Sequence, residues 1–374
     1  MMHADKFCTF NEGIYLLNHS VGRPPVSAHQ RLQAGFIEPW QTLTNDLWPR
    51  WIEEIDEFRK ATALLLNASW LDVCPQTNLS GALSKLLTAL PQNPGRDVIV
   101  YNEQDFPSMG FVLSQAQRAG FQLRCIPSDS DPLDLQVWDD QLDSSCACVL
   151  VTHVQSNTSV KVDVAGICAL ARKAGVIPIV DIAQSAGVTE IDLSQWDADF
   201  VIGSCVKWLC GGPGAAFLWA NPDIIEQCKP TDVGWFSHAD PFEFDIHDFR
   251  YAEGVLRFWG GTPSVIPYVL AANSIKLITQ IGVGQVRRHN LALNQRLLDS
   301  LPEQVAICPV LPEQRGGTAV LDFGQQRFTV EQNLLDAGVH FDSRPTGLRM
   351  SPHIYNSNAE IDVVTETILG CLKH

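Results

Sequence analysis

The sequence has few positive charges, no paired-cysteine motif and no long apolar run, and each absence excludes a class of protein. Its 26 lysine and arginine residues face 42 aspartates and glutamates, which leaves a net charge of −16. Nucleic acids and anionic membrane surfaces both need a basic face, so we expect neither as a partner. No apolar run is long enough to span a bilayer, and the first residues lack the basic and apolar regions of a signal peptide.

Cysteine is present, but its spacing excludes the usual metal sites. Eleven cysteines are spread along the chain, and none of the nearest pairs is a CxxC motif. Two histidines and two aspartates between residues 238 and 247 match no ligand template either, so a solvated acidic loop is favoured there and we predict no metal. Reduced thiols in a cytoplasmic protein are the simplest account of this composition.

The hydrophobic pattern predicts an α/β fold with a mostly parallel sheet. With 45% hydrophobic and 18% charged residues among 374, the chain can form a well-buried core, with two domains or with one large domain and a smaller appendage. Between about residues 60 and 230, short apolar strands alternate with helices, as in a sheet that is covered on both faces. Strands are expected at Asp97–Tyr101, Cys148–Thr152, Val176–Val180 and Phe200–Ile202, and helices at Gly81–Ala89, Ser108–Ala119 and Val164–Ala174.

The last third of the chain has a different pattern. A long helix is expected at Ser264–Gln280 and continues toward Leu298. It is followed by short strands at Val305–Ile307 and Thr318–Phe323, then by helices at Val330–Ala337 and Glu360–Leu372. This order predicts a smaller α+β domain that a long helix joins to the first.

A carboxylate and a lysine follow two neighbouring strands. Asp181 comes directly after Val176–Val180, and Lys207 follows Phe200–Ile202 before a glycine-rich turn. Ligands of parallel sheets bind outside the carboxyl ends of the strands, so both side chains should face one crevice. One interpretation is a semi-buried ion pair. The other is a pyridoxal phosphate site, in which Lys207 forms a Schiff base and Asp181 keeps the pyridine nitrogen protonated.

Two further segments would complete a pyridoxal phosphate site. Leu79 and Ser80 precede an amphipathic helix, where free N–H groups and a hydroxyl can bind a phosphate, although an ordinary N-cap would look the same. Phe106 follows the strand Asp97–Tyr101 and could stack on the cofactor ring, or could simply belong to the core. All of these residues fall at the predicted ligand-binding edge of the sheet.

Motifs along nearly the whole chain resemble those of a known family. They are Ile14–Gly22, Asp105–Ser108, Asp181–Gln184, Gly203–Leu209 with Gly211–Gly214, Gly234–Phe236, Gly260–Pro263 and Gly347–Asn356. In this order they resemble the fold-type I pyridoxal-phosphate enzymes, class V aminotransferase group, and within it the kynureninase-like branch. The lysine motif and the arginine motif around Arg349 are the specific ones.

The resemblance implies a fold and a domain division. It implies a large cofactor-binding domain at residues 20–262, with a mostly parallel seven-stranded sheet flanked by helices, and a small α+β domain at residues 263–374 together with residues 1–19. It also implies a homodimer with active sites at the interface, where Gly261 and Thr262 of one subunit reach the phosphate in the other.

The resemblance assigns a role to each matching residue. Lys207 is the catalytic lysine that carries the cofactor, and Arg349 binds the substrate carboxylate with a planar, bidentate grip. Cofactor-binding positions are Leu79, Ser80, Phe106, Asn157, Asp181, Ala183, Gln184, Ser204, Lys207, Trp235, Gly261 and Thr262.

Three departures from the family pattern narrow the function. Val206 stands where kynureninases have a proton-transferring tyrosine, and residues 340–346 lack the reactive cysteine of the desulfurases. Ser159 replaces a glycine that is usual in relatives. We therefore expect an enzyme that acts on an α-amino acid through an external aldimine, as a transaminase or a lyase. The alternatives are a kynureninase-type hydrolase and a non-catalytic cofactor-binding module, and the retained Lys207, Asp181 and Arg349 favour catalysis over the latter.

Overall fold

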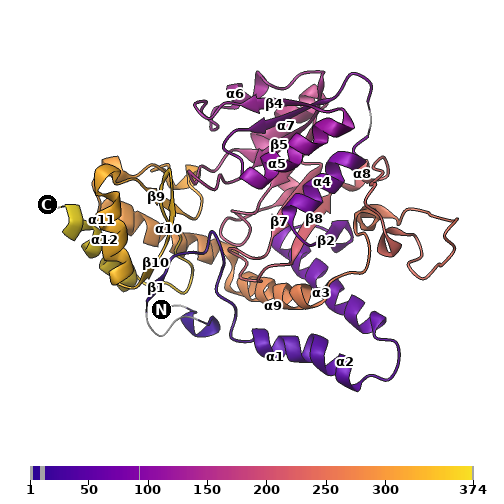
Figure 1. Cartoon of the computed structure of the whole chain (residues 1–374), viewed down its shortest axis with the longest axis horizontal. Coiled ribbons are helices and arrows are strands. Elements are labelled where there is room, and N and C mark those ends of the chain that lie inside the picture. Colours follow the sequence, from indigo (N-terminus) through magenta and orange to yellow (C-terminus); the bar gives the residue numbers. More distant parts are fainter. Residues whose placement is uncertain (1–2, 9–12, 92, 373–374) are drawn as a thin grey trace.

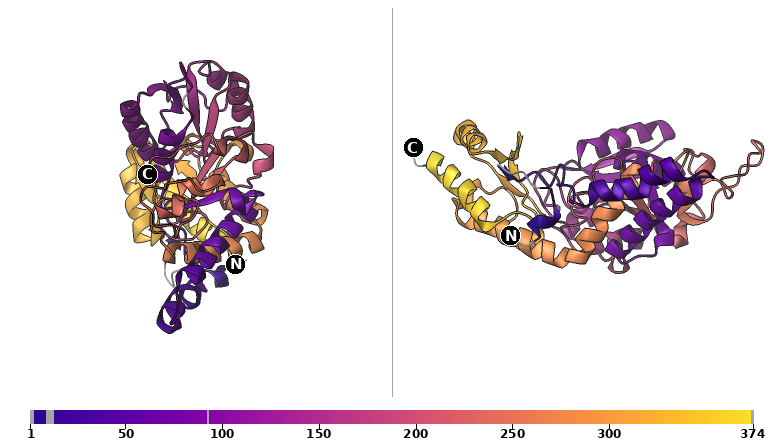
Figure 2. Two further views of the ribbon diagram at one scale, coloured as in Figure 1. Left: turned by 90° about the vertical axis from the view of Figure 1, so that its right-hand side faces the viewer. Right: turned by 90° about the horizontal axis from the view of Figure 1, so that it is seen from below.

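The computed structural model describes residues 3–8, 13–91 and 93–372. Figure 1 shows a large unit built around a sheet, and a smaller unit of C-terminal helices and short strands beside it. The right-hand view of Figure 2 places the C-terminal helices at one end of an elongated molecule. Residues 1–2, 9–12 and 373–374 of the predicted small domain, and residue 92 of the large one, lie outside the described residues.

The central sheet has seven strands, and the predicted α/β class is confirmed. Six strands run in one direction, because only β8 is antiparallel to its two neighbours. In sheet order the strands are β2 (Val73–Gln76), β8 (Ala216–Ala220), β7 (Phe200–Ser204), β6 (Ile177–Asp181), β5 (Cys146–Thr152), β3 (Val98–Asn102) and β4 (Gln122–Ile126). The four strands expected from the sequence are β3, β5, β6 and β7.

Helices cover both faces of this sheet (Figure 1), which is why its strands are apolar throughout. Alternate residues of β5 point to opposite faces of the sheet and into separate hydrophobic clusters. Val149 and Val151 belong to the first cluster, and Cys148 and Leu150 belong to the second. The first cluster includes side chains of α3 (Trp48–Leu66), α7 (Val164–Ala174) and α9 (Ile266–Ile281). The second includes side chains of α4 (Leu79–Ala89) and α5 (Pro107–Ala116).

The remaining helices of the large unit are short. They are α1 (Ala28–Leu32), α2 (Glu38–Thr42), α6 (Leu135–Asp139) and α8 (Pro222–Ile225).

The C-terminal unit has its own core, to which the N-terminal segment contributes. Its antiparallel sheet has the order β11 (Asp342–Arg344), β12 (Gly347–Met350), β9 (Ala319–Leu321), and β1 (Ile14–Tyr15) pairs in parallel with β10 (Val339–His340). Helices α10 (Val283–Asp299), α11 (Arg327–Asp336) and α12 (Asn358–Leu372) pack beside these strands. The strand expected at residues 305–307 is wrong: Ala306 forms only a single bridge to Leu321 after a 3-10 turn.

The long helix expected to join the two units is broken. Gly282, with a φ of 92°, separates α9 from α10, and the two helices are bent by 77°. A left-handed φ is accessible to glycine without a steric cost, so this residue permits the bend. Because α9 packs against α3, the core of the large unit extends past residue 263 to about Gly282. The division into domains stays a prediction.

The length and composition of the helices bear on whether they could cross a membrane. Among the described residues no single helix is long and apolar enough to cross a membrane. The bent pair α9 and α10 has the required length and composition only when its two helices are taken together.

Candidate active site

A cavity of about 180 Å³ lies at the carboxyl ends of the parallel strands. It brings together eight of the residues that the sequence singled out: Leu79, Ser80, Phe106, Asp181, Ala183, Gln184, Ser204 and Lys207. Five further lining residues were missed: Ser108, Met109, Thr152, Val154 and Ser156. Thr152 ends β5 and Val154 and Ser156 follow it closely, so a closer reading of this strand end could have found them. Ser108 and Met109 lie in the first turn of α5.

Lys207 lies in the turn after β7, with its amine in the cavity. Its Nζ is 5.6 Å from the centroid of the Phe106 ring. Burial lowers the pKa of the Lys207 amine, while Asp181 raises it and Arg349 lowers it further. In the described part of the chain no ion pair within 4.0 Å joins Lys207 to Asp181, so the simple ion-pair interpretation does not apply. A buried amine that is less basic than usual is suited to nucleophilic and proton-transfer chemistry.

Asp181 ends β6 and is buried. Its Oδ1 accepts a hydrogen bond from the Ala183 N–H at 2.7 Å. Burial raises the pKa of this carboxyl, and the Ala183 N–H and Lys207 oppose that shift. Oδ2 has no hydrogen-bond partner among the described residues, so it can pair with a protonated nitrogen in the cavity.

The N-terminus of α4 forms another wall of the cavity. Asn78 is the N-cap, and its side chain accepts the N–H of Gly81 at 2.8 Å. Because Asn78 provides the cap, the hydroxyl of Ser80 is not needed for that purpose, and Ser80 lines the cavity together with Ser204. Free helix N–H groups with two hydroxyls nearby favour an anion such as a phosphate.

One buried polar atom of the cavity wall, Oγ of Ser156, has no hydrogen-bond partner among the described residues, and it tests whether pyridoxal phosphate fits. An unpartnered buried polar atom costs roughly 1–3 kcal/mol, so a polar group in the cavity would be stabilised by it. Thr152 also lines the cavity, and its hydroxyl interacts with the buried carboxyl of Asp105. Burial also raises the pKa of Asp105 to about 7. The residues present therefore suit a group that carries a phosphate and a ring nitrogen.

Four predicted cofactor residues lie elsewhere. Asn157 does not line the cavity, although its neighbour Ser156 does. Trp235 donates its indole N–H to the hydroxyl of Thr262 at 3.2 Å, next to Gly261 and outside the cavity. The roles of these four residues stay predictions.

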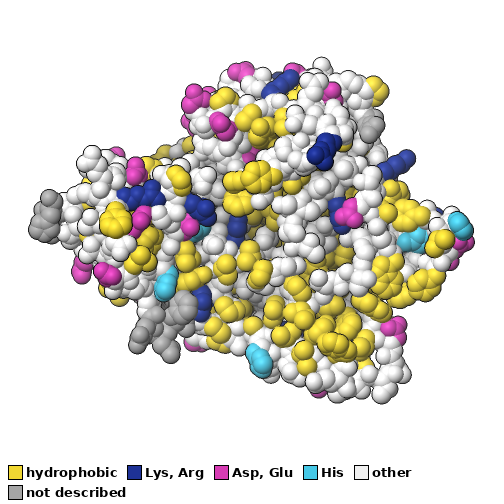
Figure 3. Space-filling model, in the orientation of Figure 1, with side chains coloured by type: hydrophobic (Ala, Val, Ile, Leu, Met, Phe, Trp, Pro, Cys, Tyr) yellow, Lys and Arg dark blue, Asp and Glu magenta, His cyan; other side chains and the backbone are white. Residues whose placement is uncertain are grey.

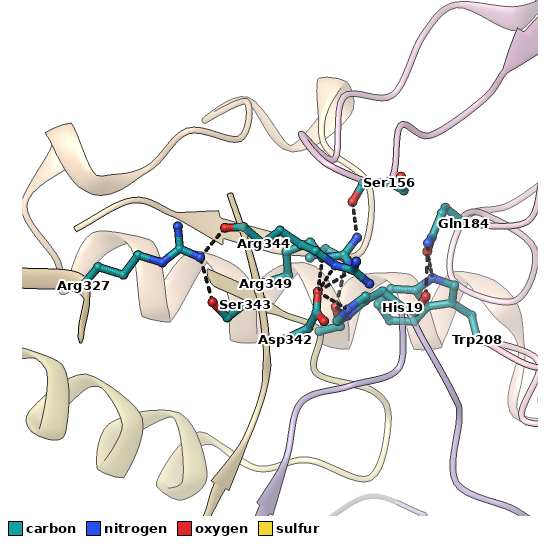
Figure 4. Close-up of polar contacts among 11 residues, drawn as sticks. His19, Ser156, Gln184, Trp208, Arg327, Asp342, Ser343, Arg344 and Arg349 are labelled. Carbon is teal, nitrogen blue, oxygen red and sulfur yellow. Dashed lines mark hydrogen bonds and ion pairs between the residues drawn. The ribbon is translucent and has the colours of Figure 1, made fainter. Parts of the chain in front are cut away.

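Arg349, on β12, is buried, and three of its five N–H groups donate hydrogen bonds (Figure 4). Its Nε and Nη2 donate to Oδ2 of Asp342 at 2.7 and 2.5 Å, and its Nη1 donates to the carbonyl of Ser156 at 2.8 Å. The Ser156 contact links Arg349 to a residue that lines the cavity. Sequence reasoning missed Asp342, although Asp342 and Arg349 are directly opposite each other across the β11–β12 hairpin.

His19 connects the N-terminal segment to the same region. Its carbonyl accepts a hydrogen bond from Nε2 of Gln184 at 3.1 Å, and Oε1 of Gln184 accepts from the Trp208 indole at 3.3 Å. The imidazole is buried, with Nδ1 2.6 Å from the hydroxyl of Ser351. Burial lowers the pKa of His19 to about 4, so the ring is neutral at pH 7.

Curated relatives share this chain's sequence over most of its length. A kynureninase of Pseudomonas fluorescens is 29% identical over 347 residues, which cover 88% of this chain and 82% of that protein. A kynureninase of Deinococcus radiodurans is also 29% identical, with the same coverage. An uncharacterised aminotransferase of Bacillus subtilis is 27% identical over 87% of this chain and 86% of its own length.

Solved structures share the fold. A cysteine desulfurase of Thermococcus onnurineus has a TM-score of 0.85 at 21% identity and covers 97% of this chain and 95% of its own. The cystine C–S lyase C-DES has a TM-score of 0.85 at 20% identity, with 96% and 97% covered.

A family model describes the chain from before the sheet to the last helix. The model for class V aminotransferases matches residues 44–364. That range includes the cavity, the lysine turn and the arginine hairpin, and it confirms the resemblance drawn from the motifs. The chain belongs to the class V aminotransferase family.

Proposed function

We propose that this chain is a pyridoxal-phosphate enzyme that acts on an α-amino acid, as a transaminase or a lyase. The observation that carries the proposal is the mostly buried amine of Lys207, whose pKa is lowered by burial, in a cavity that it shares with Asp181. Family membership and the structures of its relatives support the same cofactor, since one solved C-DES structure has glycine covalently linked to it.

Different residues of the cavity would contact different parts of the cofactor. Ser80, Ser204 and the N-terminus of α4 would hold the phosphate, Asp181 the ring nitrogen, and Phe106 would cover the ring. When bound, pyridoxal phosphate supplies a ring that withdraws electrons from the substrate Cα. Lys207 would hold the cofactor, and its amine would accept or return the proton at Cα. The lowered pKa of Lys207 favours this step, because more of the amine is uncharged near neutral pH.

Val206 favours a transaminase or lyase over a kynurenine hydrolase. Its side chain can neither donate nor accept a proton, and its carbonyl accepts the N–H of Gly22 at 2.8 Å. Kynureninase-type hydrolysis remains a second candidate because kynureninases are among the relatives at 29% identity. It would need a proton donor other than residue 206.

We further propose that the enzyme works as a cytoplasmic homodimer. Its eleven cysteines are all free, which suits a reducing compartment. Exposed hydrophobic side chains gather over α1, α2 and the loop between residues 238 and 250 (Figure 3), including Trp40, Phe244 and Ile246. Thr262 lies outside this subunit's cavity, as expected if it serves the partner's site, and Trp235 is hydrogen-bonded to it.

Mapping the cofactor attachment tests the proposal directly. The purified protein is incubated with pyridoxal phosphate, reduced with borohydride, digested and analysed by mass spectrometry. We expect a pyridoxyl group on Lys207 and its complete loss in Lys207→Ala. Lys161→Ala is the matched control, because Lys161 is also partly buried with a lowered pKa but lines a different cavity. A label that survives in Lys207→Ala, or no label in the parent protein, would refute the proposal.

Product analysis then separates the candidate reactions. The loaded enzyme is screened against amino acids, and keto acid, ammonia and alanine are measured separately. We expect keto acid with an amino acceptor for transamination, or keto acid with ammonia for elimination. Alanine formed from kynurenine would instead support the hydrolase.

A further inference from the structure

Only some of the N–H groups of the Arg349 guanidinium donate hydrogen bonds within the protein. The side chain has five N–H donors, one on Nε and two on each Nη. Asp342 takes the Nε–H and one Nη2–H, and the Ser156 carbonyl takes one Nη1–H. One N–H therefore remains on each of Nη1 and Nη2. If the Ser156 carbonyl takes the Nη1–H that points toward Cδ, the two remaining donors are parallel and match the geometry of a carboxylate.

The charges around Asp342 leave the cluster positive. Oδ2 of Asp342 also accepts a hydrogen bond from Nε of Arg344 at 3.0 Å, so one carboxylate serves two guanidiniums. His19, with Nε2 3.7 Å from the same oxygen, is the third neighbour. The Arg349 side chain is 6% exposed and that of Arg344 51%, so water screens the charge of Arg344 far more. An incoming carboxylate would meet an excess of one positive charge.

We propose that Asp342 is a positioning residue: it holds the Nε and Nη2 edge of Arg349, so that the remaining Nη1–H and Nη2–H form the pair that grips the substrate α-carboxylate. This rests on the proposed function, which makes Arg349 the carboxylate-binding residue. A guanidinium held along one edge cannot rotate, so the grip is pre-organised. The orientation of the substrate Cα bonds therefore depends on a residue that does not touch the substrate.

The alternative is that Asp342 merely competes with the substrate for Arg349. The two roles predict opposite results when the carboxylate is changed. If Asp342 positions Arg349, its removal weakens carboxylate binding. If Asp342 competes, its removal strengthens binding, because an anion no longer occupies the arginine.

Equilibrium binding of a simple carboxylate distinguishes them. Propionate, with propionamide as the uncharged control ligand, is titrated into the cofactor-loaded protein and followed by calorimetry. We expect Asp342→Ala to weaken propionate binding roughly 10- to 100-fold, as for the loss of a charge-assisted contact. Asp342→Asn keeps an oxygen that accepts from Arg349 and should bind propionate within about threefold of the parent protein.

Arg344→Gln is the matched control, because it removes a cation from the same carboxylate and leaves the contacts of Arg349 in place. It should also stay within about threefold of the parent. Propionate binding to Asp342→Ala that equals or exceeds the parent's would overturn the proposal. If that variant does not fold, Asp342→Asn decides: binding more than about tenfold tighter identifies a competitor, and unchanged binding supports positioning.

One additional assay on the same protein variants distinguishes failure of this proposal from failure of the proposed function. Each is assayed for the pyridoxyl group on Lys207 before the titration. Absence of that group refutes the proposed function. An Arg349→Gln variant that binds propionate as tightly as the parent protein refutes the role of Arg349 in binding the carboxylate.

Discussion

Replacing Gly22 by alanine should disturb the lysine turn from the N-terminal side. A Cβ at this position would lie 2.2 Å from the carbonyl oxygen of Lys207, 2.6 Å from Sγ of Cys210 and 2.9 Å from its Cα. Two of these three atoms belong to the backbone and cannot rotate away. Since Gly22 also donates its N–H to the Val206 carbonyl at 2.8 Å, the two segments cannot separate without losing that hydrogen bond.

The cost can be estimated from the displacement required. Ordinary carbon–oxygen contacts are about 3.4 Å or longer, so the backbone must move by about 1 Å. Overpacking of this kind typically costs about 1–3 kcal/mol, and the backbone neighbours place Gly22→Ala at the upper end of that range. Urea unfolding measures the change in the free energy of unfolding, and the yield of pyridoxyl-Lys207 measures the displacement of the lysine.

Gly110→Ala is the control for this experiment. Gly110 lies within α5, and a Cβ there would meet no atom within 4 Å. Its replacement should stabilise the protein by up to about 1 kcal/mol through helix propensity. If Gly22→Ala had the same stability and cofactor yield as the parent protein, the close packing of the N-terminal segment against the lysine turn would be disproved.

Two further predictions concern buried polar residues. Burial lowers the pKa of His353 to about 4, below the value of about 6.5 in the unfolded chain, so the folded state resists its protonation. The contribution of His353 to the free energy of unfolding is therefore complete above pH 6.5 and falls by about 3 kcal/mol as the pH falls toward 4. Unfolding free energies of the parent and of His353→Gln at pH 7 and pH 4.5 check this, and equal pH dependence in both would refute it. Asn290 donates to the carbonyls of Gly317 and Pro352, both at 2.8 Å, so Asn290→Ala should cost about 2–3 kcal/mol, whereas Asn333→Ala on the surface should cost less than 1. Comparable losses for the two asparagine variants in urea unfolding would contradict that expectation.

The sequence predicted the sheet and the lysine site because both depend on local patterns. β5 is a continuous apolar segment, Asp181 ends the apolar β6, and Lys207 follows β7 by three residues. In a parallel sheet this position alone determines which edge a residue occupies. The cavity therefore contains most of the residues expected from motif order.

The contacts that the sequence did not predict depend on packing between distant segments. Nothing local distinguishes Asn157 from Ser156, and only the path of the loop decides which one faces the cavity. Ser159 has a φ of 61°, and its hydroxyl accepts the N–H of Thr318 at 3.3 Å, a side-chain contact that glycine could not make. The role of Asp342 likewise depends on a hairpin register that its own segment does not reveal.

The pairing of β1 with β10 has a consequence for how this protein folds. Asn18 donates to the carbonyl of Ser351, 333 residues away, at 2.7 Å, and Leu16 accepts the N–H of the same serine at 2.8 Å. Contacts between such distant residues form late, because the loop they close must first lose its conformational freedom. The segment that packs over the lysine turn is synthesised 333 residues before its partner Ser351. The cofactor-binding turn can therefore be completed only after residue 351 has been translated.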